Sequence, residues 1–161
     1  MILVSCGTEK YPFNRLATMV QELALHHPER KFIYQSRVLE IIPRGKNIDV
    51  QQLLPYREFR SLIQQCHRYI CHAGIGSIVT ALAEGIMPLV IPRRHDLGEH
   101  VDDHQLQITR KMADLNMIRV FHSMTELEAL ITDEKQQKVH YLFQNRPLLA
   151  DLETTVNRWL K

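Results

Sequence analysis

Apolar positions along the chain fall either into short continuous runs or into steps of three and four residues. The short runs predict buried strands, and the longer periodic segments predict amphipathic helices. The predicted strands cover residues 1–6, 31–35, 48–54, 69–71, 89–91 and 118–121. The predicted helices cover residues 13–27, 55–65, 77–84, 103–115, 124–131, 135–144 and 148–160. Residues 36–47 stay unassigned, because Pro43, Gly45 and Asn47 mark turns there.

This alternation of strands and helices predicts an α/β fold: a Rossmann-like parallel sheet with helices on both faces. Ligands of such sheets bind beyond the carboxyl ends of the strands, near a topological switch. The loops after the strands at residues 1–6, 69–71 and 89–91 are therefore the expected site, and all are rich in Gly, His, Arg or Asp. We expect one domain over residues 1–161, with C-terminal helices from about 124 to 160.

Composition narrows the class of protein. The formal net charge of +2 is too small to predict a nucleic-acid-binding face. Cys6, Cys66 and Cys71 form no C-x-x-C pair, which favours a reduced, cytosolic chain. The apolar run at residues 1–4 is too short for a signal peptide, and no later stretch approaches the roughly 18 residues of a membrane span. We therefore expect a cytoplasmic protein that reaches a membrane only through a partner.

The loop after the strand at 69–71 contains Gly74, Gly76 and Ser77 ahead of an apolar helix. Glycines let the backbone approach a ligand closely, and Ser77 could cap the helix or bond a phosphate oxygen. The positive end of the helix dipole also favours an anion. The alternative is that the two glycines only make a tight turn between strand and helix, since short glycine motifs recur widely.

Two other strand ends carry related signals. Gly7 and Thr8 follow the first strand and repeat the glycine signal in a weaker form, for which an ordinary turn is the simpler explanation. Arg93 and Arg94 follow the strand at 89–91 and could hold a diphosphate between two guanidinium groups. The alternative for this pair is a solvated surface position.

The segment after the arginine pair is the most polar of the chain. Its candidate side chains are His95, Glu99, His100, Asp102, Asp103, His104 and Gln105. The i, i+4 spacing of His100 and His104 suits a metal, but a zinc site would also need a third ligand and a defined geometry, and no H-E-x-x-H motif is present. The alternatives are a polar helix start capped by an aspartate, or recognition of sugar hydroxyls by Asp, His and Gln side chains. Glu99 and the aspartates are also formally available as general bases.

Three stretches resemble glycosyltransferase family 28. His72-Ala73-Gly74-Ile75-Gly76-Ser77, with Gly85-Ile86-Met87-Pro88 and an apolar strand, is similar to its C-terminal half, which binds the UDP-sugar in GT-B enzymes. Ser5-Cys6-Gly7-Thr8 with Pro12-Phe13-Asn14-Arg15-Leu16 resembles the small subunit of the dolichol-linked chitobiose synthase. Residues 92–105 resemble the small subunits of two-component bacterial transferases for exopolysaccharide or capsule. The resemblance covers roughly residues 1–120.

The resemblance implies half an enzyme: the donor-binding subunit of an inverting, metal-independent hexosyltransferase without a cofactor. The donor would be a UDP-sugar and the acceptor a lipid-linked saccharide, held with the main general base by a membrane-anchored partner subunit. The residues that would hold the nucleotide and diphosphate are Gly7, Thr8, His72, Gly74, Gly76, Ser77, Thr80, Arg93 and Arg94. Those that would hold the sugar are Glu99, Asp103, His104 and Gln105, with Glu99 and His100 as catalytic candidates.

One position departs from the family pattern, and two other functions stay open. Many members carry a glutamate that bonds the ribose where this chain has Thr80. A non-catalytic accessory subunit would need the docking surface for its partner but not an intact sugar site. Half of a UDP-sugar epimerase-like fold is disfavoured, because such enzymes carry both domains in one chain. An isolated donor domain would also expose the face meant for its partner, where homodimers could form.

Overall fold

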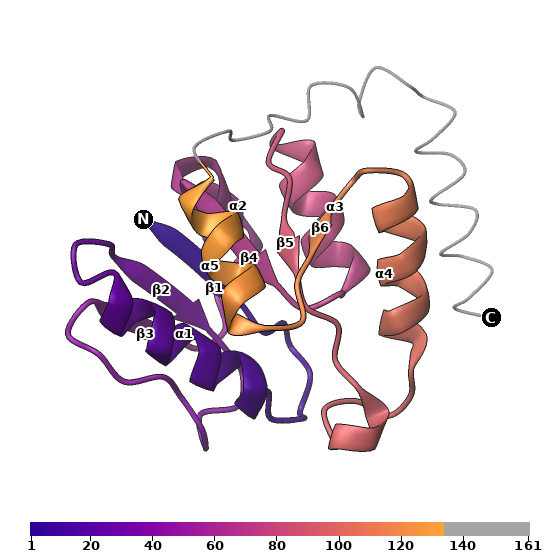
Figure 1. Cartoon of the computed structure of the whole chain (residues 1–161), viewed down its shortest axis with the longest axis horizontal. Coiled ribbons are helices and arrows are strands. Elements are labelled where there is room, and N and C mark those ends of the chain that lie inside the picture. The colour runs from indigo at the N-terminus through magenta and orange to yellow at the C-terminus, as the bar shows by residue number, and fades with distance from the viewer. Residues whose placement is uncertain (134–161) are drawn as a thin grey trace.

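The computed structural model describes residues 1–133, so the predicted helices at 135–144 and 148–160 lie outside the described residues. The strands are β1 (Ile2–Ser5), β2 (Phe32–Gln35), β3 (Ile48–Gln51), β4 (Arg68–Cys71), β5 (Leu89–Val90) and β6 (Arg119–Val120). The helices are α1 (Asn14–His26), α2 (Tyr56–Gln65), α3 (Ile75–Ala83), α4 (His104–Asp114), α5 (Met124–Thr132) and the short 3₁₀ helix η1 (His95–Leu97). The predicted α/β fold is confirmed (Figure 1).

The six strands form one parallel sheet in the order β3-β2-β1-β4-β5-β6. Ile2 of β1 lies opposite Phe32 of β2 on one side and opposite Arg68 of β4 on the other. The chain therefore builds the sheet outward in one direction from β1 and then returns to add β4 on its other side. A crevice opens at such a reversal, beyond the carboxyl ends of the two central strands.

Both faces of the sheet are covered, which explains why the central strands read as continuous apolar runs. Ile2 and Val4 face the layer of α1 and α5, with which they share one hydrophobic core. Leu3 and Cys71 face the opposite layer, where apolar residues of α2, α3 and α4 form a second core. In Figure 1, α1 and α5 lie together on one side of the sheet and α3 and α4 on the other.

The observed boundaries correct two details that bear on the site. The helix predicted from Ser77 begins two residues earlier, at Ile75, with Gly74 as its N-cap. Pro55 is the N-cap of α2 rather than its first residue. Residues 36–47 contain neither helix nor strand and connect β2 to β3 along the flank of α1. Within residues 1–133, the helices are all too short or too polar to cross a bilayer.

Candidate functional site

A cavity of about 200 Å³ lies at the carboxyl ends of the central strands, where α3 begins. It is lined by Ser5, Gly7, Thr8, Gln35, Leu53, Leu54, Tyr56, Phe59 and Ser77. The lining combines hydroxyl and amide groups from the ends of β1 and β2 with apolar and aromatic side chains that follow β3. A small number of polar groups among apolar walls is the usual character of a small-molecule site.

The first turn of α3 leaves its backbone donors open toward this region. Gly74, the N-cap, has no side chain that could accept a hydrogen bond, and the first bond runs from Ile78 N to Gly74 O at 3.1 Å. The N–H groups of Ile75, Gly76 and Ser77, here called the α3 amide cluster, donate to no residue among those described. A Cβ atom added at Gly76 would meet no atom within 4 Å. The α3 amide cluster can therefore receive an anion.

The predicted cap at Ser77 is not observed, because that residue lies inside the first turn of the helix. The Ser77 side chain instead contributes to the cavity wall. Thr80, one turn further along, donates its hydroxyl to Gly76 O at 2.8 Å and is buried. This bond keeps the Thr80 hydroxyl on its own helix, in the place where the family resemblance suggested a ribose ligand.

His72 fills the space between the two glycine loops. A Cβ atom would lie 2.4 Å from His72 Cε1 if added at Gly7 and 2.1 Å from His72 Nε2 if added at Gly74. Gly7 also has a φ of +77°, which side-chain-bearing residues rarely adopt. The imidazole is only 6% exposed, and its Nδ1 has no partner among the described residues. Burial, assisted by the nearby Arg93 charge, lowers the pKa of His72 to about 3, so the ring is neutral.

The loop after β1 is fixed by buried polar side chains of the sheet. Ser5 Oγ donates to Gln35 Oε1 at 2.7 Å and accepts from Gly7 N at 3.3 Å. Gln35 Nε2 in turn donates to Gly7 O at 3.3 Å. Both backbone polar groups of Gly7 are thus engaged, while Thr8 is exposed at the rim of the cavity. Gly7 makes room for the imidazole, and Thr8 is the member of this pair that a ligand could reach.

Arg93 does not have the geometry expected of a diphosphate ligand. Its side chain is 1% exposed, and the guanidinium lies over the Phe13 ring, with Cζ 4.5 Å from the ring centroid. Nη1 donates to Tyr11 O at 2.9 Å and to Glu99 O at 3.0 Å, and Nη2 donates to Cys6 O at 2.8 Å. Arg93, which the sequence offered as a diphosphate ligand, is here a buried link that joins the loop after β1 to the loop after β5.

The other member of the pair, Arg94, points to solvent and pairs with Asp96 two residues later, at 2.9 Å from Nε to Oδ1. Glu99, which the sequence offered as a sugar ligand and catalytic candidate, is 4% exposed and holds Arg15 with both oxygens, at 3.1 and 2.8 Å. Glu99 Oε2 also accepts from Arg94 N at 3.0 Å. A buried carboxylate already engaged in these bonds is a brace between α1 and the β5–α4 loop, and it is not placed to act as a base or a sugar ligand.

Gln105, at the start of α4, links the loops that follow β4 and β5. Its side chain is buried, and Oε1 accepts from Ala73 N at 3.2 Å and from Arg93 N at 3.1 Å. This orientation is unambiguous, because two backbone donors require the amide oxygen rather than its NH₂ group. The bridge sets the distance between the N-cap region of α3 and the start of α4, and the amide nitrogen remains for a ligand.

The remaining polar residues of the β5–α4 segment share one carboxylate. His104 Nδ1 lies 2.7 Å from Asp102 Oδ2, and His100 Nδ1 lies 3.1 Å from Asp102 Oδ1. Asp103 Oδ1 accepts from His95 N at 3.1 Å, and the His104 side chain is 63% exposed. Within residues 1–133 no three His, Cys, Asp or Glu side chains gather in a way that could hold a metal ion.

The structure brings together residues that the sequence motifs placed apart, and it adds others. Gln35, Leu53, Tyr56 and Phe59 line the cavity but were not among the predicted site residues. Their only sequence signal is position, since Gln35 ends β2 and the others follow β3. The end of β2 identifies Gln35, whereas Tyr56 and Phe59 lie on α2 and no local motif marks them as site residues.

The fold and the site together define a Rossmann-like α/β domain with an open helix N-terminus at its topological switch point. Residues 1–148 match the sequence profile of the glycosyltransferase family 28 C-terminal domain. The chain belongs to this family of glycosyltransferase domains, as its sequence motifs suggested. No curated protein sequence matches the chain.

Solved structures show the same fold. The glycotransferase of kitacinnamycin matches with a TM-score of 0.60 at 19% identity, over 82% of this chain and 34% of its own length. MurG of Acinetobacter baumannii matches with a TM-score of 0.53 at 19% identity, over 86% of this chain and 42% of its own length. The solution structure of ALG13 matches with a TM-score of 0.60 at 16% identity, over 94% of this chain and 93% of its own length. The chain thus spans less than half of two of these proteins and nearly all of the third.

Proposed function

We propose that this chain is the donor-binding subunit of an inverting, metal-independent glycosyltransferase that uses a UDP-sugar. The observation that carries the proposal is the α3 amide cluster, open beside Gly76 at the switch point of a family 28 domain. A nucleoside diphosphate has the charge that such a helix terminus favours. The neutral His72 lies beside this cluster, and its Nδ1 has no partner among the described residues. This nitrogen can form a hydrogen bond with a phosphate oxygen or with a protonated phosphate.

The two ends of the donor have distinct places in this proposal. The uridine would occupy the cavity of about 200 Å³, between the apolar residues that follow β3 and the hydroxyls of Ser5, Thr8 and Ser77. The hexose would extend toward the start of α4, where His104 and the Gln105 amide nitrogen lie at the edge of the polar segment. We propose Asp103 as the third polar residue that contacts the hexose.

The reaction follows from what the helix terminus can stabilise. In an inverting transfer the acceptor hydroxyl attacks the anomeric carbon, and the bond to the UDP oxygen breaks with its electrons on the diphosphate. The α3 amide cluster would stabilise the departing negative charge in place of a metal ion. Both Glu99 oxygens are engaged with Arg15. We therefore assign the base that takes the hydroxyl proton to an acceptor-binding partner, with His100 as the second candidate.

The biological setting is part of the same proposal. ALG13 shares this fold over 93% of its own length, so its size is consistent with a donor-binding domain that works beside a separate partner. We propose that a membrane-anchored partner supplies a lipid-linked saccharide acceptor, that the product enters exopolysaccharide or capsule, and that this chain works at the cytoplasmic side.

Calorimetric titration of the purified chain tests donor binding. UDP should bind, uridine should bind far more weakly, and EDTA should leave the UDP affinity unchanged. His104→Ala should reduce the preference for one UDP-hexose over another without changing the affinity for UDP itself. Stimulation of a partner transferase by a chain that binds no uridine nucleotide would favour the accessory role.

A further inference from the structure

The loop between β2 and β3 concentrates positive charge. Residues 36–47 contain the bases Arg37, Arg44 and Lys46 and one acid, Glu40, so their formal charge is three minus one, or +2. This value equals the formal net charge of the whole 161-residue chain, and the rest of the sequence therefore sums to zero. A local excess of this kind on an otherwise neutral protein points to a binding surface.

The same loop exposes aliphatic side chains and is held firmly. Leu39 is 38% exposed and Ile41 is 45% exposed. Asn47 Nδ2 donates to the carbonyl oxygens of Ala24, His27 and Arg30 at 3.0 to 3.1 Å, which anchors the end of the loop on α1. The loop that carries these two side chains is thus attached to the α1 layer at its C-terminal end.

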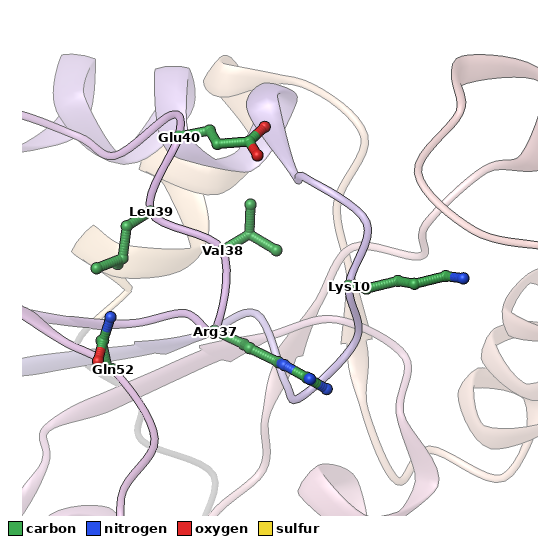
Figure 2. A pocket seen from close by; sticks show the side chains of 6 residues that line it. All are labelled: Lys10, Arg37, Val38, Leu39, Glu40 and Gln52. Carbon is green, nitrogen blue, oxygen red and sulfur yellow. The ribbon is translucent and has the colours of Figure 1, made fainter.

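A hollow of about 510 Å³ joins this loop to the loops after β1 and β3 (Figure 2). Lys10, Arg37, Val38, Leu39, Glu40 and Gln52 line it. In this view the side chains of Lys10 and Arg37 extend toward the same side, and that of Leu39 extends toward the other. Arg37 Nη1 donates to Thr8 O at 3.2 Å, so the second basic loop is tied to the first.

The bases of this surface lack the ion pairs that several arginines elsewhere in the domain form. Arg15, Arg60 and Arg94 each pair with a carboxylate. Over residues 1–133, no carboxylate forms an ion pair with Lys10 or with the three bases of the loop. Four cations without anionic partners, next to exposed aliphatic groups, match the chemistry of an anionic lipid surface.

We propose that Lys10 and the β2–β3 loop form a docking surface for an anionic phospholipid bilayer. Headgroup phosphates would enter the hollow beside Lys10 and Arg37, while Leu39 and Ile41 would rest in the bilayer interface. The surface does not use the α3 amide cluster, so bilayer binding and nucleotide binding succeed or fail separately. Each base near an anionic bilayer strengthens binding by about fivefold, and two together by about 25-fold.

Co-sedimentation of the full chain with vesicles tests the proposal. One set contains only phosphatidylcholine, and the other contains three parts of phosphatidylglycerol to seven of phosphatidylcholine. We expect binding to the anionic vesicles alone, with loss in 0.5 M NaCl. The double variant Lys10→Glu/Arg37→Glu should weaken this binding at least 25-fold. Leu39→Ser/Ile41→Ser should also weaken it, while the remaining binding keeps its dependence on salt.

Arg110→Glu on α4 is the control for the single variant Arg37→Glu, because it reverses the charge of an exposed base in the opposite helix layer. It should bind vesicles as the wild type does, after allowance for a net-charge change of two. The free headgroup glycerophosphoglycerol at 10 mM should not displace the vesicles; displacement would assign the hollow to a soluble phosphate ester and overturn the bilayer proposal. Absence of binding, equal binding to both vesicle types, or an equal effect of Arg110→Glu and Arg37→Glu would also overturn it.

Discussion

Substitutions at Gly76 should move stability and ligand binding in opposite directions. A Cβ at this position meets no atom within 4 Å, and the residue lies in the first turn of α3. Replacing glycine by alanine in a helix stabilises it by roughly 0.5–1 kcal/mol, chiefly because the unfolded chain loses freedom. For a domain of this size that corresponds to a rise in Tm of about 1–4 °C.

The variant Gly76→Asp tests the effect of a negative charge at the same position. A carboxylate in the first turn of a helix stabilises it by about 0.3–1 kcal/mol, so this variant should also fold at least as stably as the wild type. The same carboxylate would lie in the first turn of α3 beside a phosphate on the α3 amide cluster, and we take their separation as about 4 Å. At an effective dielectric constant of 20, two like charges at this separation repel by about 4 kcal/mol. UDP affinity should therefore fall at least a hundredfold.

Gly76→Asn is the matched control, because it has the size of aspartate without the charge. Thermal unfolding with and without UDP measures both effects in one experiment, since a ligand at a hundredfold excess over its Kd adds about 2.7 kcal/mol of stability. Wild type should gain several degrees with UDP, Gly76→Asn part of that gain, and Gly76→Asp none. A lower Tm for Gly76→Ala, or an undiminished UDP shift for Gly76→Asp, would refute the reasoning.

Other positions give further tests. Gly74→Ala should cost about 1–3 kcal/mol of stability, because its Cβ would lie 2.1 Å from His72 Nε2, and urea unfolding should show partial recovery in the double variant with His72→Ala. Because the folded-state pKa of His72 is about 3 and the unfolded one about 6.5, the free energy of unfolding should fall as pH drops below 6.5, by up to about 1.4 kcal/mol per pH unit, and His72→Asn should flatten this slope. Gln105→Leu should cost about 2–4 kcal/mol by stranding the N–H groups of Ala73 and Arg93, whereas Gln105→Glu keeps an acceptor and should lose much less on the same denaturant curve.

The order and type of the strands and α-helices in residues 1–133 could be predicted from sequence, because each strand is a short apolar run and each helix repeats apolar residues at steps of three and four. The short helix η1 was not predicted. The location of the site followed from the same pattern, since parallel strands bring their carboxyl ends to one edge. The start of α3 was placed two residues late, because Ile75 extends the apolar pattern of the loop as well as that of the helix. Propensity alone does not show which glycine is the N-cap.

The roles of individual polar residues were harder to predict, because they depend on partners far away in sequence. Arg93 and Arg94 are neighbours, yet one is buried among carbonyl oxygens of the β1–α1 loop and the other is exposed. Glu99 reaches Arg15, 84 positions earlier. No local motif encodes such contacts, so two buried braces were predicted to be ligands.

The two glycines of the central motif have different reasons to be glycine. Gly74 is required by the His72 ring that packs against it, whereas Gly76 has open space beside it. A sequence shows both as members of one phosphate-binding pattern. The structure separates a glycine that the fold needs from a glycine whose missing side chain leaves the α3 amide cluster accessible.

The most direct test of the central claim is a titration of the ¹⁵N-labelled chain with UDP, followed through the backbone amide resonances. The account predicts that the largest shift changes fall on the amides of Ile75, Gly76 and Ser77, with smaller changes at Thr8 and along residues 53–56. It would be contradicted if UDP left these amides unchanged, or if the shifts gathered instead at the hollow beside Lys10 and Arg37.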